Sequence, residues 1–169
     1  MTRRPRWVLA LATAALLLTG LAACAPWSAW LLYNPSASAP RGWYLRRPLR
    51  DPQPGALVLA HLPPATAGFA ERRGYLPSSV PLLKRVAAIA PQHVCVRESA
   101  VRIDGRIVGY ARTRDGAGRP LAAWPGCRAL RAGEVFLLAP GSAASFDGRY
   151  FGPVPRSAVF GEAVPLWTW

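Results

Sequence analysis

The sequence predicts a mostly β domain that follows a single N-terminal transmembrane helix. Pro and Gly supply 18 and 15 of the 169 residues, a composition typical of short strands and turns rather than of a helical bundle. Short apolar or β-branched segments alternate with turn signals, which favours antiparallel strands. Only residues 7–25 depart from this pattern, because they form one long uncharged run. With 51% apolar residues, the chain can bury a core, which excludes a protein disordered throughout.

Residues 1–32 are predicted to be a membrane anchor or signal-like segment. Three Arg lie within the first six residues, and the next charged residue is Arg41. The run at 7–25 has close to the ~20 apolar residues that cross a bilayer. Basic residues tend to stay on the cytoplasmic side. We therefore expect a single-pass protein of the inner (cytoplasmic) membrane, with its N-terminus in the cytoplasm and residues 33–169 forming a periplasmic domain.

Two other interpretations of this segment remain open. A cleaved signal peptide has a similar charged start and apolar run. Leu21-Ala22-Ala23-Cys24 also has the form of a lipobox, in which Cys24 would be lipidated. All three interpretations export the domain, and an oxidising compartment permits a disulfide.

Cys95 and Cys127 are the other two cysteines of the chain, so they form the possible disulfide, with two buried thiols as the alternative. No CxxC motif and no His/Cys ligand spacing occurs, so we predict neither a metal nor another cofactor.

The predicted elements follow the apolar segments of the exported part. Strands are predicted at 55–62, 93–97, 133–140 and 158–167. The segment 101–110 reads as a hairpin, because Asp104-Gly105 is a favourable two-residue turn. The apolar segment 82–90 is too short for periodicity to distinguish a strand from a helical turn. Irregular or turn-rich structure is expected at 33–45, 63–81, 111–132 and 145–155.

Lys84 is the only Lys beside 20 Arg, and it lies within the apolar run PLLKRVAA (81–88). Burial disfavours the ammonium and can lower a Lys pKa toward neutrality, which a guanidinium does not permit. A neutral Lys amine can act as general base for a Ser hydroxyl. The alternative is an ordinary surface Lys beside Arg85. The two His of the chain, His61 and His93, lie in or beside strand patterns and are weaker candidates for a base.

The partner for such a base would be a Ser in an exposed turn, and SASAPRG (36–42) offers two. Ser36 and Ser38 lie two residues apart, so in an extended segment their side chains point the same way. One could be the nucleophile, while the other hydroxyl and a backbone N–H face the oxyanion. Chemistry alone permits either assignment, and a plain Ser/Ala/Pro linker is the alternative.

The third segment is SFDGRYFGPVP (145–155), whose Gly, Pro and aromatic residues indicate a fixed loop. Asp147 and Arg149 could pair and hold this loop, and Ser145 could hydrogen-bond an amine. The alternative is a well-packed turn before the last strand.

SASAPRGWY (36–44), LLKRVAA (82–88) and SFDGRYFGPVP (145–155), in this order behind an anchor, resemble the type I signal peptidase family of Ser–Lys membrane proteases. The spacing Ser-x-Pro-x-Gly-x-Tyr from Ser38 is similar to the conjugative-transfer, TraF-type branch. The resemblance covers essentially the whole chain. It implies an antiparallel, β-rich peptidase domain. One departure is Gly148, where the related loop often reads Asp-Ser-Arg.

The resemblance implies a role for each matching residue. Ser38 would be the nucleophile and Lys84 the general base. Ser36 would complete the oxyanion hole, and Ser145 would orient the Lys. Asp147 and Arg149 would be the paired loop residues.

The implied partner is an exported, prepilin-like precursor with small residues before the cut. The resemblance is compatible with two outcomes, hydrolysis or cyclisation of the product, and the sequence does not distinguish them. Two rival hypotheses are a non-catalytic anchored or lipidated scaffold of a secretion or conjugation apparatus, and a self-cleaving Ser–Lys regulator. The anchor disfavours the regulator, and the pairing of Lys84 with the Ser turn disfavours the scaffold.

The net charge of +13 does not indicate nucleic-acid binding. The Arg residues are scattered, and no basic helix or aromatic-interleaved nucleic-acid motif occurs. We instead expect attraction to anionic membrane lipid, because Arg41, Arg46, Arg47 and Arg50 would follow the anchor directly.

Overall fold

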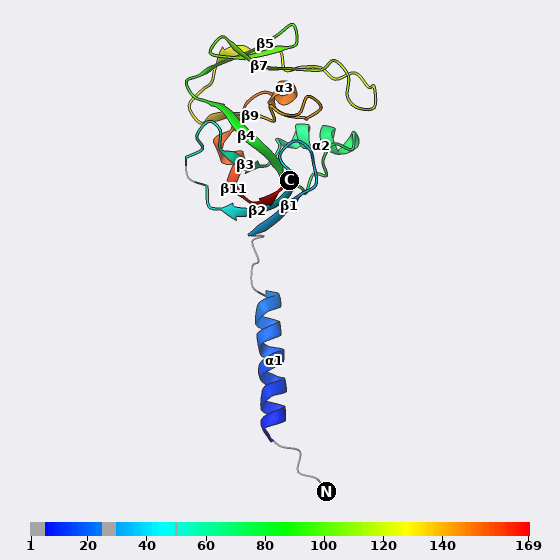
Figure 1. Ribbon diagram of the computed structural model, residues 1–169, viewed down its shortest axis with the longest axis vertical. Helices are drawn as coiled ribbons and strands as arrows, with labels where there is room; N and C mark the ends of the chain where they lie inside the picture. The colour runs from blue at the N-terminus through cyan, green and yellow to red at the C-terminus, as the bar shows by residue number, and fades with distance from the viewer. Residues whose placement is uncertain (1–5, 25–29, 50) are drawn as a thin grey trace. The chain divides into compact units, whose positions relative to one another are not determined.

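The computed structural model describes residues 6–24, 30–49 and 51–169 (Figure 1). The chain divides into two compact units, Met1–Trp30 and Leu31–Trp169. The second unit carries two antiparallel sheets and three short helical segments, so the mostly β prediction is confirmed.

The first unit contains one helix, α1, over Arg6–Cys24. Ala and Leu make up most of its 19 residues, and both favour helix. None of the described helices combines the length and the apolar character that a bilayer span requires. The predicted transmembrane helix therefore has no support in the structure. The lipidation alternative at Cys24, the last residue of α1, stays a prediction.

Seven strands form the larger sheet, in the order β1-β2-β11-β3-β4-β9-β10. Their bounds are Leu31–Asn34 (β1), Gly42–Arg47 (β2), Leu57–Ala60 (β3), Leu82–Ile89 (β4), Glu134–Leu138 (β9), Val154–Pro155 (β10) and Val159–Thr168 (β11). The last strand, β11, pairs with both β2 and β3. The C-terminal strand thus joins the β1–β2 hairpin to the rest of the sheet.

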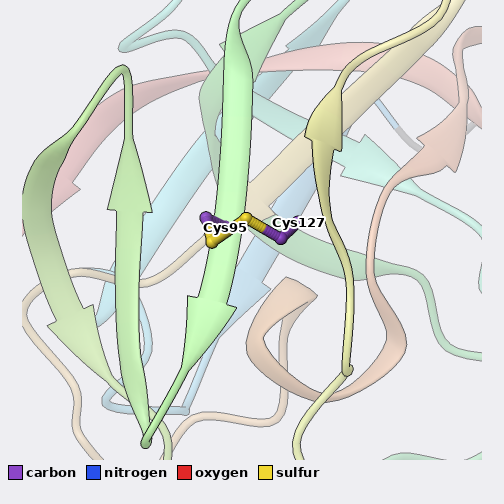
Figure 2. The surroundings of a disulfide bond; sticks show 2 residues. All are labelled: Cys95 and Cys127. Carbon is purple, nitrogen blue, oxygen red and sulfur yellow. A yellow bond between two sulfur atoms is a disulfide. The ribbon is translucent and has the colours of Figure 1, made fainter.

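Four strands form the smaller sheet, in the order β7-β6-β5-β8. Their bounds are His93–Arg97 (β5), Ala100–Ile103 (β6), Arg106–Tyr110 (β7) and Cys127–Ala129 (β8). The predicted hairpin is confirmed as β6–β7, and both turn residues, Asp104 and Gly105, have positive φ angles of 48° and 80°. Cys95 of β5 and Cys127 of β8 lie opposite each other and form a disulfide (Figure 2).

One core cluster joins the two sheets. Val94 and Val101 of the smaller sheet pack with Phe136 and Leu138 of β9. A second cluster lies on the larger sheet around Val58, Val86 and Leu137, all at most 1% exposed. Since β4 and β9 contribute to both clusters, the centre of the larger sheet is its most constrained part. This is the part that carries Lys84.

Each of the four segments expected to be irregular or turn-rich contains regular structure. The segment 63–81, expected to be a loop, contains α2 over Pro64–Arg72, which Pro begins favourably at its first turn. The segment 33–45 contains part of β1 and of β2 rather than irregular chain. The strand β8 lies within 111–132, and the short helix α3 over Gly148–Phe151 lies within 145–155. A 3₁₀ turn over Arg156–Ala158 precedes β11. Each missed element is short, so it lacks the long periodicity on which sequence patterns depend.

Candidate active site

The turn that carries Ser36 and Ser38 connects β1 to β2 and is organised by Asn34. Asn34 is buried at the end of β1. Its Nδ2 donates to the carbonyl oxygens of Ser36, Ala39 and Pro40 at 3.0–3.1 Å. Its Oδ1 accepts from the backbone N–H of Ser36 at 3.1 Å. One amide side chain therefore replaces the ladder bonds that this turn lacks, as Asn does in many tight turns.

The two Ser hydroxyls meet within this turn. Ser36 Oγ donates to Asn34 Oδ1 at 2.7 Å and lies 3.0 Å from Ser38 Oγ. Because the single Ser36 hydroxyl hydrogen goes to Asn34, Ser38 is the donor in the second contact. The predicted turn is present and the segment is not extended, so alignment along an extended chain does not explain the pair. The hydroxyls converge because the chain turns at residues 36–39.

Lys84 is held in the centre of the larger sheet. It lies opposite Val58 of β3, and its neighbour Arg85 lies opposite Leu138 of β9. The residue is 5% exposed, and no hydrogen bond or ion pair joins its side chain to another described residue. Burial lowers the pKa of Lys84 to about 8, Asp147 opposes this shift, and Arg149 adds to it. The expected surface alternative for Lys84 is therefore wrong.

Asp147 and Arg149 form the buried ion pair that the sequence predicted. The guanidinium binds both carboxylate oxygens, with Nε–Oδ1 and Nη2–Oδ2 distances of 2.8 Å. The two side chains are 0% and 5% exposed. Two parallel charge-assisted bonds compensate the desolvation of both groups. Asp147 Oδ2 also accepts the backbone N–H of Ala139 at 2.9 Å, which ties the loop to the end of β9.

Arg149 also binds backbone carbonyl oxygens of the loop that carries Ser145. Its Nη2 donates to the carbonyl oxygens of Ser142 at 2.7 Å and Ser145 at 3.3 Å. Its Nη1 donates to Tyr110 O at 3.2 Å, at the end of β7. Arg149 therefore fixes the loop after β9 against the smaller sheet, while Asp147 ties the same loop to the end of β9.

Gly148 allows this loop to lie close to β9, beside which α3 is seen in Figure 1. A Cβ at this position would lie 2.7 Å from Leu137 O and 2.9 Å from the Phe136 ring. The Gly in place of the related Ser therefore reflects close backbone packing in this chain.

Ser145 Oγ is buried, and it is the one buried side-chain polar atom of the described residues without a hydrogen-bond partner. Such orphaned groups are uncommon, and a catalytic role is one of their explanations. Ser145 and Lys84 line the same cleft.

This cleft has a volume of about 860 Å³, and its walls are mostly apolar. Ser36, Ser38, Lys84 and Ser145 all line it, so three separate segments bring their predicted site residues to one place. The apolar walls include Leu32, Leu59, Val80, Leu82, Leu121 and Phe146. A hydroxyl, an amine and a second hydroxyl in an apolar cleft are the groups that Ser–Lys acyl transfer requires.

In the described ranges, no three His, Cys, Asp or Glu side chains lie close enough together to bind a metal ion. His61 stacks on Phe160 with ring centroids 4.4 Å apart, and His93 begins β5. Neither His lines the cleft.

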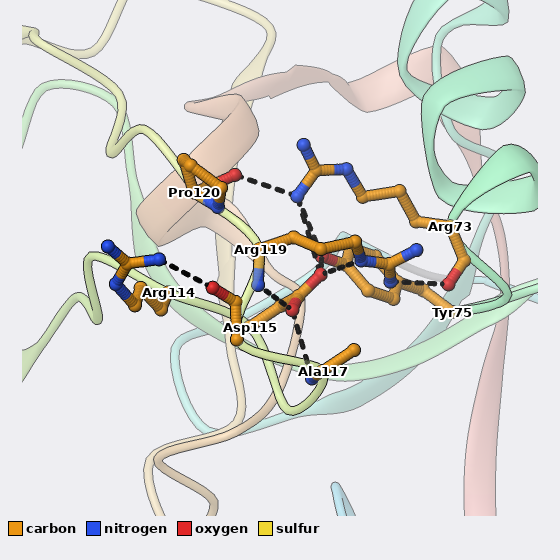
Figure 3. A network of polar contacts seen from close by, with 8 residues as sticks. Arg73, Tyr75, Arg114, Asp115, Ala117, Arg119 and Pro120 are labelled. Carbon is orange, nitrogen blue, oxygen red and sulfur yellow. Dashed lines mark hydrogen bonds and ion pairs between the residues drawn. The ribbon is translucent and has the colours of Figure 1, made fainter.

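Sequence reasoning missed two groups at this site. Asn34 was overlooked, although Asn before Pro35 is a turn signal. The second group is a cluster on Asp115, which binds Arg73, Arg119 and Tyr75 at the cleft (Figure 3). No local pattern predicts the contacts of Asp115 with Arg73 and Tyr75, because these residues are some forty positions away, whereas Arg119 is only four residues away.

Comparisons with known proteins identify relatives of this chain. The sequence model of a family described as "Signal peptidase, peptidase S26" matches residues 4–169. The chain is 34% identical over 169 residues to "Plasmid transfer protein TraF" of Escherichia coli, covering 92% of this chain and 91% of that protein. It is 36% identical over 177 residues to "Conjugal transfer protein TraF" of Agrobacterium tumefaciens (strain 15955), covering 98% of both. A solved signal peptidase I from Enterococcus faecalis V583 aligns with a TM-score of 0.41 and 18% identity, over 68% of this chain and 97% of that one.

Proposed function

The chain belongs to the signal peptidase family, peptidase S26, and to its TraF branch, and from this premise we propose that it is a Ser–Lys endopeptidase. Ser38 is the nucleophile and Lys84 is the general base. The observation that carries the proposal is the buried Lys84, with its pKa lowered to about 8, in the same cleft as Ser38. A base of this pKa is partly neutral near physiological pH, which an exposed Lys is not.

In the proposed reaction, the neutral Lys84 amine takes the hydroxyl proton as Ser38 Oγ attacks the carbonyl carbon of the scissile bond. The tetrahedral intermediate collapses, and the Lys84 ammonium gives its proton to the leaving amine. An acyl-enzyme on Ser38 remains. Water then attacks the ester through the same base, which releases the acid and restores Ser38.

The remaining residues support these steps. The backbone N–H of Ser38 and the Ser36 hydroxyl face the oxyanion, and Ser36 must turn from Asn34 to do so. The Ser145 hydroxyl, which has no hydrogen-bond partner in the structure, is available to accept one from the Lys84 ammonium that forms during the reaction, and the Asp147–Arg149 pair holds its loop. The choice of Ser38 as nucleophile is supported by the Ser36 hydroxyl hydrogen, which Asn34 already engages.

The substrate is proposed to be an exported precursor with small residues before the cut. The relatives are named for plasmid or conjugal transfer, which favours a prepilin or another protein of a conjugation apparatus. The substrate N-terminus could capture the acyl-enzyme in place of water and give a cyclic product.

The domain is proposed to act in the periplasm, and the Cys95–Cys127 disulfide supports an oxidising compartment. Attachment of the N-terminal segment to the inner membrane, and contact of the adjacent Arg residues with its lipid, belong to the same proposal. Fusion of alkaline phosphatase after residue 169 tests the location, since that enzyme is active only when exported. An inactive but intact fusion would contradict it.

Activity is tested with the full-length protein in membranes and a candidate prepilin from the same locus, followed by mass spectrometry. Ser38→Ala and Lys84→Arg should each lower the rate by about 10³-fold or more, whereas Ser157→Ala, an exposed control in the 3₁₀ turn, should not. The product mass separates hydrolysis from cyclisation by one water.

The pH dependence provides a second test of the base. The wild-type kcat/KM should rise with pH and level off above about pH 8, as Lys84 loses its proton. Cleavage by Lys84→Arg would contradict the assigned base. Failure of the folded wild-type protein on several exported precursors would favour the non-catalytic scaffold.

A further inference from the structure

A second cleft meets the first at the proposed nucleophile. It has a volume of about 560 Å³, and Ala37 and Ser38 line both clefts. Its other walls come from residues 39–41 of the turn before β2, from Leu57 of β3, from Arg85 of β4, from the loop after β9 and from Trp169. Trp169 is tied in place, because its backbone N–H donates to Arg41 O at 3.0 Å. Ser38 therefore lies between two concave surfaces.

Charged side chains line both clefts, but Asp115 is among those of the first cleft, where it pairs with Arg73 and Arg119. Arg41 and Arg85 line the second cleft, and no Asp or Glu is among its lining residues. Arg85 Nη1 donates to Gly55 O at 2.9 Å, which leaves its positive charge uncompensated. Among the ion pairs of the described residues, none includes Arg41 or Arg85. Two unpaired cations in one concavity attract an anionic group.

An extended polypeptide advances about 3.3 Å per residue, so a substrate with its scissile carbonyl at Ser38 continues away from Ser38 in both directions. The first cleft has mostly apolar walls and takes the small residues before the cut in the proposed function. The second cleft is then the path for the residues that follow the cut.

We propose that the second cleft binds the substrate segment C-terminal to the cleaved bond, and that Arg41 and Arg85 select a carboxylate there. This inference rests on the proposed peptidase function. The carboxylate has two possible sources, which are an Asp or Glu side chain soon after the cut, and the free C-terminus of a short released tail.

Binding is measured first, with full-length Ser38→Ala protein, so that no cleavage is required. The probes are fluorescent peptides that span one precursor cut site, with Glu or Gln at each of the first three positions after the cut. Each peptide is made with a free and an amidated C-terminus. If a side-chain carboxylate is selected, the Glu peptides should bind about fivefold more tightly than the matching Gln peptides. If the C-terminal carboxylate is selected, the free-acid peptides should bind about fivefold more tightly than the amidated ones.

Variants of Arg41 and Arg85 test whether the second cleft causes the preference for a carboxylate. Arg41→Gln and Arg85→Gln should each reduce it to about twofold, whereas Arg85→Lys, which keeps the charge, should retain most of it. Arg97→Gln, an exposed Arg at the end of β5, is the matched control and should leave the preference unchanged. Raising ionic strength from about 0.05 to 0.5 M should diminish the preference, because the charges are exposed.

Cleavage by the wild-type protein then separates the two proposals. Equal binding of Glu and Gln, and of free and amidated peptides, overturns the second-cleft proposal even if all peptides are cut. An equal loss of preference in Arg97→Gln also overturns it. Carboxylate-selective binding that depends on Arg41 and Arg85 supports the cleft even if the wild-type protein cuts none of the peptides, a result that overturns the peptidase proposal alone.

Discussion

Asp147 and Asp115 are both held by Arg, but in different surroundings. Asp147 and its partner Arg149 are two residues apart and almost fully buried. Asp115 is also buried, yet its partners Arg73 and Arg119 have side chains that are 22% and 42% exposed. Tyr75 donates to the same carboxylate oxygen at 2.5 Å, from a segment forty residues away. The first pair is local in sequence and deep, whereas the second cluster is shallower and links Asp115 and Arg119, four residues apart, to Arg73 and Tyr75 in a distant segment.

The comparison shows two uses of one kind of contact. The Asp147–Arg149 pair fixes the loop that places Ser145 in the cleft with Lys84, and both members influence the pKa of Lys84. The Asp115 cluster joins the loop at 111–121 to the segment after α2, along the wall of the same cleft (Figure 3). The hydrogen bond from Tyr75, the largest influence, lowers the pKa of Asp115, and Arg119 adds to the effect. The deep pair therefore supports the chemistry, and the shallow cluster shapes the cleft.

The largest effect is expected for Asp147→Asn. It leaves the Arg149 charge buried without a counter-ion, which should cost about 3–5 kcal/mol of unfolding free energy. Guanidinium unfolding followed by circular dichroism measures the loss. The double variant Asp147→Asn/Arg149→Met should recover part of it, because both charges are then gone. A loss under about 1 kcal/mol would mean that the pair does not hold the loop.

Lys84→Met tests the unpaired buried charge beside that pair. Between about pH 8 and pH 10.5 the unfolded chain keeps the Lys84 proton that the folded protein releases, so the stability of the wild-type protein rises with pH in this window. Below about pH 8, the buried ammonium costs about 3 kcal/mol. Lys84→Met should therefore stabilise the protein by up to that amount at pH 7, while abolishing cleavage.

The measurement for Lys84→Met is the unfolding free energy at pH 7 and pH 10.5, compared with the wild-type protein. The excess unfolding free energy of Lys84→Met over the wild-type protein should be smaller at pH 10.5 than at pH 7. An advantage that does not depend on pH would show that Lys84 already titrates normally in the folded protein.

Gly148→Ala tests how closely the Asp147 loop approaches β9. The added Cβ would meet Leu137 O at 2.7 Å, so a loss of about 1–3 kcal/mol is expected from overpacking. Gly109→Ala on β7 is the matched control, because nothing lies within 4 Å of its added Cβ. Chemical denaturation of both variants makes the comparison, and equal changes would rule out close packing as the reason for Gly148.

Asp115→Asn should have the smallest effect on global unfolding. Its exposed partners can return to water, so the change should loosen the loop at 111–121 and make its proteolysis about tenfold faster. The carboxylate contribution is fully present above about pH 4 and is lost as pH falls through the lowered pKa. Proteolysis mapped by mass spectrometry provides the measurement. A global loss as large as that of Asp147→Asn would remove the distinction between the two clusters.

Much of the fold could be predicted from local pattern. The strands β5, β6, β7, β9 and β11 were expected near their observed positions, because apolar segments and turn residues define them. The helix α2 was missed, since its Pro and Gly neighbours resemble a loop. The segment at 82–90 is a strand because β3 pairs with one of its edges and β9 with the other. The residues of 82–90 alone do not show these pairings.

For the site, a lone Lys in an apolar run and a Ser-rich turn are local signals. The residue types and their order along the chain were therefore sufficient to single out Ser36, Ser38, Lys84, Ser145, Asp147 and Arg149. The burial of Lys84, the Asn34 bonds, the Asp115 cluster and the second cleft required the folded chain. Burial, hydrogen bonding and charge compensation depend on which distant segments become neighbours, and the antiparallel pairing of the larger sheet decides that.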